Sequence, residues 1–182
     1  MRNNTPVTSR EYALREGMAI VSRTDAKGRI TDVNADFIEA SGFTEAELIG
    51  QPHNLVRHPD MPAEAFADLW TTLKAGRPWT GLVKNRGKDG DHYWVVANVT
   101  PLLEGERTVG YLSVRTVPTR AQVDAAEAAY RSFRNGQAQG LAIRDGHVVP
   151  ARGPGLPEKL ALAPLRVRAA ALGGAAGLAM AT

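Results

Sequence analysis

The chain has 182 residues, which allows one domain of ordinary size and a tail, because most domains have about 100–150 residues. Hydrophobic residues make up 43% and charged residues 23% of the sequence, so neither a wholly disordered nor a membrane-embedded chain is expected. The net charge is +3, and the absence of cysteine excludes disulfides, thiolate catalysis and cysteine-ligated metal.

The first half of the sequence predicts a hairpin and two short helices. The opening "MRNNTPVTSREY" lacks the apolar core of a signal peptide, so the N-terminal domain is expected in the cytoplasm. Two β-rich runs, Ala19 to Thr24 and Arg29 to Val33, flank a turn that ends in glycine, which indicates a β-hairpin. Helices are predicted at Ala35 to Ser41 and at Thr44 to Ile49, because each is followed by glycine.

A longer helix follows after residue 60. Its predicted buried face has the i, i+3, i+4, i+7 spacing and consists of Phe66, Leu69, Trp70 and Leu73. Asp60 is placed to cap this helix, Pro62 fits its first turn and Gly76 can end it.

Three strand-like runs come next, at Trp79 to Asn85, Asp91 to Thr100 and Thr108 to Thr116. The middle run is apolar or aromatic on both faces, so the sheet needs a cover on each side. A helix from Thr119 through Asn135 is expected to supply the second cover. Tyr93 and Trp94 of the middle run are expected in the core, as is Trp70 of the preceding helix. The solvated strand-end groups are expected to be Lys84, Asp91 and His92.

The C-terminal part is read as a linker and a membrane-proximal end. Residues 1–130 carry 15 Lys and Arg against 17 Asp and Glu, whereas residues 131–182 carry 7 against 2. A basic segment before an apolar one is typical of the cytoplasmic flank of a membrane anchor. The 14 residues after Arg168 are uncharged. A membrane-spanning helix needs about 20 apolar residues, so we expect the truncated start of a membrane anchor. A disordered Gly/Ala-rich end is the alternative.

This order of elements predicts an α+β fold, an antiparallel five-stranded sheet with helices on one face. A cofactor-sized pocket is expected between sheet and helices, walled by Trp70, Trp79 and the inward residues of the strands. No aromatic residue follows Phe133 to stack on bases, so no nucleic-acid partner is expected. The expected divisions are an N-terminal cap or flexible segment at 1–17, a folded domain at 18–118, a helix at 119–136, a linker at 137–168 and the apolar segment at 169–182.

The stretch "GQPHNLVRHPDMP", residues 50–62, is dense in polar and rigid residues. His53 and His58 are five apart with prolines beside them, which is not a helical metal pair, and no third ligand follows at a familiar spacing. One axial histidine is enough for haem, so haem stays open. Enzymatic catalysis is not expected, because no nucleophile or phosphate loop accompanies His58 and Asp60. Arg57 and His58 suit an anion or an electron-rich heterocycle.

This stretch and "PWTGLVKNRGKDGDHYWV" closely resemble the PAS domains of bacterial aerotaxis receptors, a group of methyl-accepting chemotaxis proteins. The resemblance covers roughly residues 18–117. It implies a five-stranded PAS sensor that binds FAD non-covalently in the cytoplasm, reports redox state or oxygen, and is not an enzyme. The implied cofactor-binding positions are His53, Arg57, His58, Asp60 and Trp79, with Asn34 and Asn85 carried over less firmly.

The resemblance also implies a mechanism and partners. Trp79 would stack on the flavin ring, and Arg57 and His58 would donate to flavin or diphosphate oxygens. Reduction would alter hydrogen bonding at Asn34, Asn85 or His53. The full-length parent would be a homodimer anchored in the inner membrane, with a HAMP unit and a signalling bundle that binds CheA and CheW. A ligand-free PAS interaction module and a haem-binding PAS sensor are the alternatives.

Overall fold

The structure, a computed structural model, describes residues 4–151, and the predictions made for residues 152–182 lie outside that range. In chain order its elements are β1 (Ala19–Asp25), β2 (Ile30–Val33), α1 (Ala35–Ser41), α2 (Glu45–Leu48), the 3₁₀ helix η1 (His53–Val56), α3 (Ala63–Lys74), β3 (Trp79–Arg86), β4 (His92–Glu104), β5 (Arg107–Thr116), α4 (Arg120–Arg134), β6 (Leu141–Arg144) and β7 (His147–Pro150). Within the described residues, no helix is long and apolar enough to cross a membrane.

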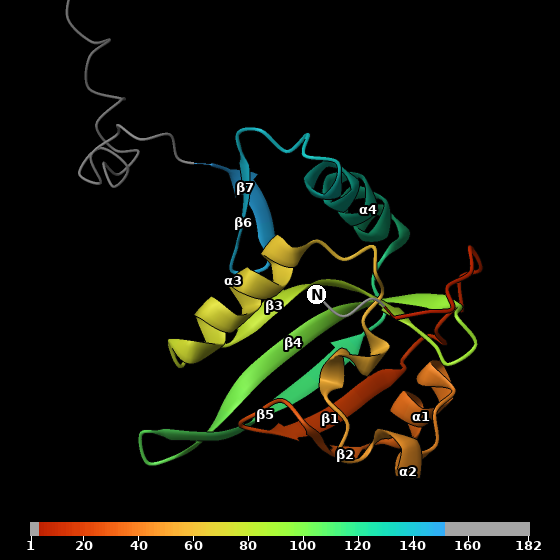
Figure 1. The fold of residues 1–182 in the computed structure, drawn as a ribbon, viewed down its shortest axis with the longest axis vertical. Coiled ribbons are helices and arrows are strands. Elements are labelled where there is room, and N and C mark those ends of the chain that lie inside the picture. Colours follow the sequence, from red (N-terminus) through yellow and green to blue (C-terminus); the bar gives the residue numbers. More distant parts are fainter. Residues whose placement is uncertain (1–3, 152–182) are drawn as a thin grey trace, which may run out of the picture. The chain divides into compact units, whose positions relative to one another are not determined.

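Five of the strands form one antiparallel sheet in the order β2-β1-β5-β4-β3 (Figure 1). The β1–β2 hairpin joins the β3–β4–β5 meander through the pairing of β1 with β5. The predicted α+β fold with a five-stranded antiparallel sheet is therefore confirmed, as are the hairpin and the three later strands. Alternation along each strand divides the side chains between two faces.

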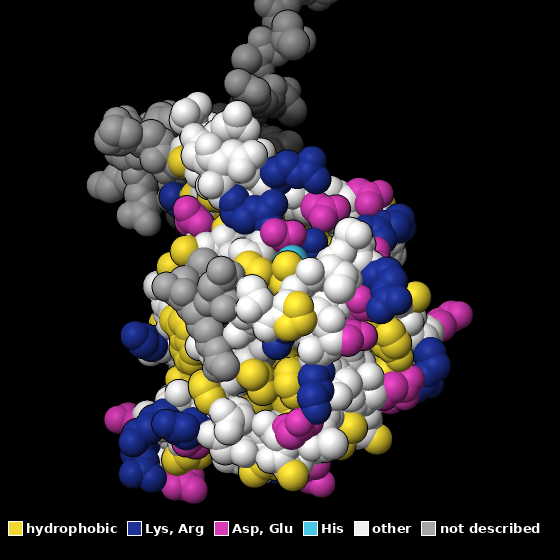
Figure 2. Space-filling view, turned by 45° about the vertical axis from the view of Figure 1, so that its right-hand side comes forward, with side chains coloured by type: hydrophobic (Ala, Val, Ile, Leu, Met, Phe, Trp, Pro, Cys, Tyr) yellow, Lys and Arg dark blue, Asp and Glu magenta, His cyan; other side chains and the backbone are white. Residues whose placement is uncertain are grey.

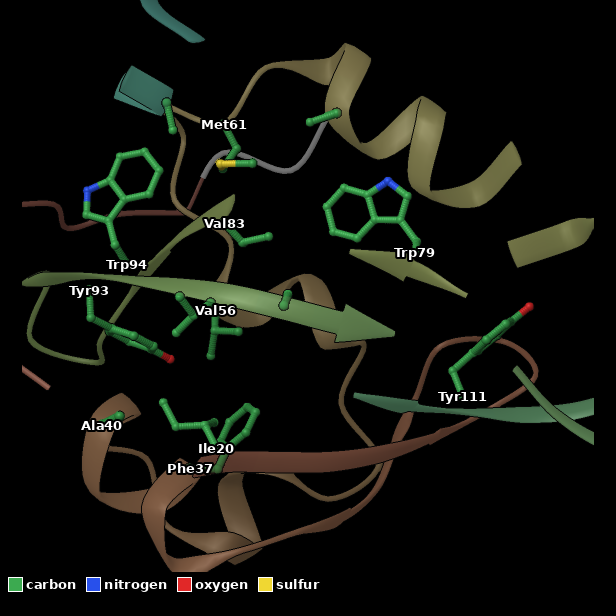
Figure 3. Packing of buried hydrophobic residues seen from close by; sticks show 14 of the residues in the cluster. Ile20, Phe37, Ala40, Val56, Met61, Trp79, Val83, Tyr93, Trp94 and Tyr111 are labelled. Carbon is green, nitrogen blue, oxygen red and sulfur yellow. The ribbon is translucent and has the colours of Figure 1, made fainter. Parts of the chain in front are cut away.

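One face of the sheet packs against α1, α2, η1 and α3. Tyr93 points from β4 toward Ile20 and Phe37, and all three side chains are buried (Figure 3). Burial of such aromatic and aliphatic side chains contributes about 1.5–3 kcal/mol each and holds the small helices on the sheet. The predicted core position of Tyr93 is confirmed.

The other face is covered by α4, as the sequence predicted. Trp94 points away from Tyr93 (Figure 3) and its ring stacks on that of Tyr130, with centroids 6.2 Å apart and planes 26° apart. The Tyr130 hydroxyl donates to the Leu82 carbonyl oxygen at 2.7 Å. At the start of α4, Thr119 and Gln122 exchange the hydrogen bonds of a capping box. These contacts fix α4 against β3 and β4.

The start of α3 differs from the prediction. Its N-cap is Pro62, with no side-chain cap bond, so Asp60 does not cap the helix. The Asp60 carboxylate instead accepts hydrogen bonds from Lys84 Nζ at 2.8 Å and from Arg134 at 2.6 Å. Lys84, expected to be solvated, is only 5% exposed, and His92 is also buried. Two cations compete more strongly for this carboxylate than backbone N–H groups do.

The N-terminal segment, for which a cap and a flexible segment were the alternatives, packs along the domain in residues 4–16. The backbone N–H of Thr8 donates to the Gly90 carbonyl oxygen at 2.9 Å. Arg15 pairs with Glu39 of α1 at 2.7 Å, and Glu11 pairs with Arg120 of α4 at 2.8 Å. The segment thus connects the β3–β4 turn with helices on both faces.

A second, two-stranded sheet lies within the expected linker. It is the β6–β7 hairpin, and its turn residues Asp145 and Gly146 both have positive φ. Their backbone N–H groups donate to the Asp68 carboxylate of α3 at 3.0 and 2.8 Å. A Cβ at Gly146 would overlap the Thr80 carbonyl oxygen, so only glycine fits this turn against β3.

Candidate functional site: a cationic cavity between sheet and helices

A cavity of about 200 Å³ lies between the inner face of the sheet and the segment formed by η1 and α3. The predicted pocket between sheet and helices is thus present. Strands contribute polar side chains to its wall, and α3 contributes apolar ones. The lining of the cavity includes Thr24, His53, Arg57, Phe66, Leu69, Trp70, Leu73, Asn85, Tyr111, Ser113 and Arg115.

The apolar wall is the face of α3 that was predicted to be buried. Phe66 and Leu69 are half-buried, Leu73 is buried, and Trp70 is 37% exposed. The Trp70 ring meets that of Tyr111 edge to face, at 5.5 Å between centroids. The core prediction for Trp70 was therefore wrong, because the i, i+3, i+4 pattern cannot distinguish a filled core from a cavity wall.

The loop around η1 carries the first cationic side chain. Asn4 is buried, and its Nδ2 donates to the carbonyl oxygens of Asn54 at 2.7 Å and Arg57 at 2.9 Å. The Asn54 carbonyl oxygen also accepts the Arg57 backbone N–H at 3.2 Å, so Asn4 adds a second hydrogen bond there. A backbone bridge joins Arg57 to Asn85, and the Arg57 guanidinium lies 3.4 Å above the Phe66 ring. The loop is therefore held from behind by the N-terminal segment.

Arg115 is the second cationic side chain, and it comes from β5. Burial lowers the pKa of Arg57 and lowers that of Arg115 to about 10, so both remain charged at neutral pH. Neither guanidinium forms an ion pair with a carboxylate among residues 4–151. Buried charges normally have a counter-ion. This cavity therefore favours an anionic or electron-rich occupant.

His53 adds a neutral ring beside these cations. Burial, Arg115 and Arg57 together lower the pKa of His53 to about 3, so its imidazole is uncharged at neutral pH.

Charged side chains on the surface are paired differently from those in the cavity. Figure 2 shows Lys and Arg interspersed with Asp and Glu over the face in view. There, Arg10 pairs with Asp91 and Lys88 with Glu47. Arg57 and Arg115 differ from these surface cations in having no carboxylate partner among residues 4–151.

Three polar atoms at the cavity wall are buried without a hydrogen-bond partner among the described residues. They are Thr24 Oγ1, Ser113 Oγ and Arg57 Nε. Leaving a buried polar group unpaired costs about 1–3 kcal/mol. A planar ring with several nitrogen and oxygen atoms would satisfy such groups while its faces contact Phe66 and Leu69. The donors and acceptors present thus fit a flavin-like heterocycle.

Of the seven site residues predicted from the sequence, the structure brings His53, Arg57 and Asn85 together at the cavity. Asn34 has another place, as the N-cap of α1. Its Oδ1 accepts from the backbone N–H groups of Val21 and Phe37, both at 3.0 Å, and its Nδ2 donates to the Ala19 carbonyl oxygen. Its Oδ1 and one N–H of its Nδ2 are used in joining β1 to α1.

His58 and Asp60 also lie outside the cavity lining. His58 Nδ1 accepts from the Asp60 backbone N–H at 3.0 Å, and the His58 ring meets the His92 ring edge to face. Burial and the Lys84 charge lower the pKa of His58 to about 4. These residues belong to a buried polar cluster with Lys84 near α4, so a role at the cavity would have to be indirect.

Trp79 is 1% exposed and is not part of the cavity wall. Its ring lies beneath α3 (Figure 3), and its Nε1 donates to Asp68 Oδ2 at 2.7 Å. The structure therefore does not place Trp79 in the cavity wall, and its stacking on a ligand stays a prediction. An indole at the edge of a strand also suits a place under a helix, where its N–H finds an acceptor.

The sequence predicted that inward residues of the strands wall the pocket, but it did not single out Thr24, Tyr111, Ser113 or Arg115. A signal for three of them was present, because residues 111, 113 and 115 alternate along one strand and so share one face. An arginine on an inward face is the unusual member of that set. Among the described residues, no three acidic or histidine side chains are grouped so as to hold a metal ion.

A family model described as the PAS fold matches residues 17–115. The chain is 45% identical over 151 residues to the aerotaxis receptor of Escherichia coli (strain K12), which covers 80% of this chain and 30% of the receptor. It is 35% identical over 83 residues to the nitrogen fixation regulatory protein of Klebsiella pneumoniae, covering 46% of this chain and 17% of that protein. The chain thus spans less than a third of the length of these relatives.

Two solved structures share the fold. The PAS domain of a protein from Colwellia psychrerythraea has a TM-score of 0.52 and 24% identity, and covers 57% of this chain and 88% of that one. The dark structure of the blue-light photoreceptor Aureochrome1 LOV has a TM-score of 0.54 and 17% identity, with 60% and 85% covered. Sheet order, helix placement and the matched residues agree: the chain belongs to the PAS fold family.

Proposed function

We propose that the chain is the sensory input domain of an energy-taxis receptor, that it binds FAD non-covalently in its cavity, and that it reports redox state or oxygen without acting as an enzyme. The observation that supports this most is that the half-buried Arg57 and the buried Arg115 line the cavity without a carboxylate partner among residues 4–151, in a wall that also holds the unpaired Thr24 Oγ1 and Ser113 Oγ. The 45% identity to an aerotaxis receptor gives the biological context.

The residues that would hold the cofactor are Arg57, His53, Asn85, Ser113 and Arg115. The cavity of about 200 Å³ is below the ~300–1,000 Å³ of typical ligand pockets, so it suits the ring system rather than a whole dinucleotide. Bound FAD supplies reversible electron uptake. The two cations favour the more negative form of the ring and so raise its reduction potential. A change in hydrogen bonding at Asn85 or His53 would act directly on β3 and η1.

The parent protein supplies the rest of the proposal. By similarity to the aerotaxis receptor, the domain would lie in the cytoplasm, and the parent would be a homodimer anchored in the inner membrane. A HAMP unit and a signalling bundle would then pass the state of the domain to CheA and CheW. The β6–β7 hairpin and α4 follow the sensor domain in sequence and both contact it, so they are the first segments to receive a change.

The test is a visible absorption spectrum of the purified 182-residue chain, followed by heat release and chromatography of the ligand. We expect flavin bands and released FAD, with colour lost in Arg57→Ala and in Asn85→Ala while the far-UV circular dichroism is retained. Arg23→Ala is the matched control, because Arg23 is exposed on β1 and should keep the colour. A haem Soret band, or a chain that stays colourless after incubation with FAD, contradicts the proposal.

A further inference from the structure

The contact between His53 and Arg115 determines which imidazole nitrogen carries the proton. The Arg115 terminal nitrogen Nη2 lies 2.6 Å from His53 Nε2. A guanidinium has five N–H donors and no acceptor. His53 Nε2 must therefore accept in this contact, which requires that Nε2 is unprotonated.

The second nitrogen of His53 then holds the remaining proton. Burial and the charges of Arg115 and Arg57 disfavour the doubly protonated ring. A neutral imidazole carries one proton, and with Nε2 excluded that proton is on Nδ1. The network thus assigns the Nδ1–H tautomer to His53.

The surroundings of Arg115 make this assignment rigid. Its Nη1 and Nη2 both donate to Ser22 Oγ at 3.2 Å, and its guanidinium lies 5.5 Å from the centre of the Phe37 ring. Arg115 is on the strand between β1 and β4, opposite Ile20 and Ala97. A side chain held in the middle of a sheet and bonded twice to one hydroxyl has little freedom to release Nε2.

The Nδ1 side of the ring has no such partner. His53 lines the cavity and meets the Phe37 ring edge to face at 5.9 Å. Both hydrogen-bond contacts of its ring, with Arg115 and with Ser22 at 3.3 Å, are made by Nε2. Within residues 4–151 no acceptor is bonded to Nδ1, so its N–H is available to an occupant of the cavity.

We propose that Arg115 is a positioning residue that, through Nε2, holds His53 as an Nδ1–H donor toward the cavity ligand. The selected ligand must present an acceptor there, a carbonyl oxygen or a pyridine-type nitrogen, and the flavin ring has both. The ligand part of this inference rests on the proposed function, whereas the tautomer does not. Arg115 therefore sets the direction of a hydrogen bond that His53 makes.

The tautomer is tested on the 182-residue chain labelled with ¹⁵N-histidine, without added ligand, by two-bond ¹H–¹⁵N correlation. The His53 signal is assigned by its loss in His53→Gln. We expect a pyrrole-type Nδ1 and a pyridine-type Nε2 in the wild type, and a shift toward Nε2–H in Arg115→Met. Arg23→Ala is the matched control and should keep Nδ1–H, because Arg23 is exposed on β1 and is not part of this network. A wild-type Nε2–H tautomer, or no change in Arg115→Met, overturns the proposal.

The ligand part is tested with FAD on the same variants. We expect Arg115→Met to bind FAD at least tenfold more weakly and to lower the midpoint potential of what is bound, while Arg115→Lys, which can donate to Nε2, retains more of both. If Arg115→Met does not fold, the comparison of Arg115→Lys with Arg23→Ala decides in its place: Arg115→Lys should lose part of the affinity and potential, and Arg23→Ala should keep both. Equal affinity and potential in folded Arg115→Met and wild type contradict the proposal. Failure of the wild type to bind FAD overturns the proposed function and leaves the tautomer result standing.

Discussion

Asp68 Oδ2 accepts a 2.7 Å hydrogen bond from Trp79 Nε1, and the same carboxylate accepts the backbone N–H groups of Asp145 and Gly146. One side chain of α3 therefore joins the first residue of β3 to the turn of the β6–β7 hairpin. The neighbouring residues of α3, Phe66 and Leu69, line the cavity. The helix that walls the cavity is thus also the helix to which the C-terminal hairpin is attached.

Replacing Asp68 by Ala is expected to detach this hairpin. Three donors lose a charged acceptor, and a hydrogen bond to a charged group contributes about 1.5–3 kcal/mol. We expect the free energy of unfolding in urea to fall by at least about 1.5 kcal/mol, with faster amide exchange across residues 141–150. Asp32→Ala is the control, because Asp32 is exposed on β2. Unchanged exchange in the hairpin of Asp68→Ala contradicts this role.

A side chain is expected to be more destabilising at Gly146 than at Gly140. Both have φ near +80°, so alanine costs backbone strain of about 1–3 kcal/mol at either position. Only at Gly146 would the added Cβ overlap Thr80, whereas nothing lies within 4 Å of a Cβ at Gly140. Gly146→Ala should therefore lower the melting temperature more than Gly140→Ala and release the hairpin. Equal effects would show that the hairpin does not press on β3.

The ion pair of Lys84 predicts an order of stability between two variants. Lys84 is buried and is paired with Asp60 and, at 3.4 Å, with Glu127. Asp60→Asn removes the nearer partner of a buried cation. Removing one partner of a buried ion pair lowers the free energy of unfolding by about 3–5 kcal/mol. The loss is smaller here because the Asp60 side chain is 43% exposed. Lys84→Met leaves Asp60 bonded to Arg134. Urea unfolding should therefore find Asp60→Asn less stable than Lys84→Met, and the reverse order contradicts the assignment.

His53 predicts a loss of stability in mild acid. Its pKa is lowered to about 3 in the folded chain and is about 6.5 when unfolded. Between these values the unfolded state binds more protons, so stability is full above about pH 6.5 and falls as the pH is lowered, by up to about 1.4 kcal/mol per unit. His53→Gln should weaken the fall in urea midpoint between about pH 7 and about pH 5. An unchanged fall would mean that His53 is not buried beside Arg115 and Arg57.

Much of the fold follows from local sequence signals. Runs of strand-forming residues predicted β3, β4 and β5, and the helices predicted to begin at Thr119 and Thr44 are α4 and α2, in which these threonines are the N-caps. Such signals are local, because period and capping are read within a few residues. The same reasoning failed at Asp60, where Lys84 and Arg134, far along the chain, bind the carboxylate.

The site was less predictable than the fold, because long-range contacts decide which side chains reach the cavity. The motif at residues 50–62 correctly drew attention to His53 and Arg57 as wall residues. It could not show that His58 turns toward Lys84, nor that Trp79 lies under α3. Arg115 is a single inward arginine on a strand, and only its contact with His53, 62 residues earlier in the sequence, reveals its place.

The central claim is that the cavity is a binding site for one FAD. The most direct measurement is gel filtration of the purified chain after incubation with excess FAD, with flavin absorbance and protein quantified in the same peak. We expect one flavin per chain in the wild type and little flavin in Arg57→Ala, with the same elution volume for both proteins. A wild-type peak without flavin, or equal flavin in Arg57→Ala and wild type, would contradict it.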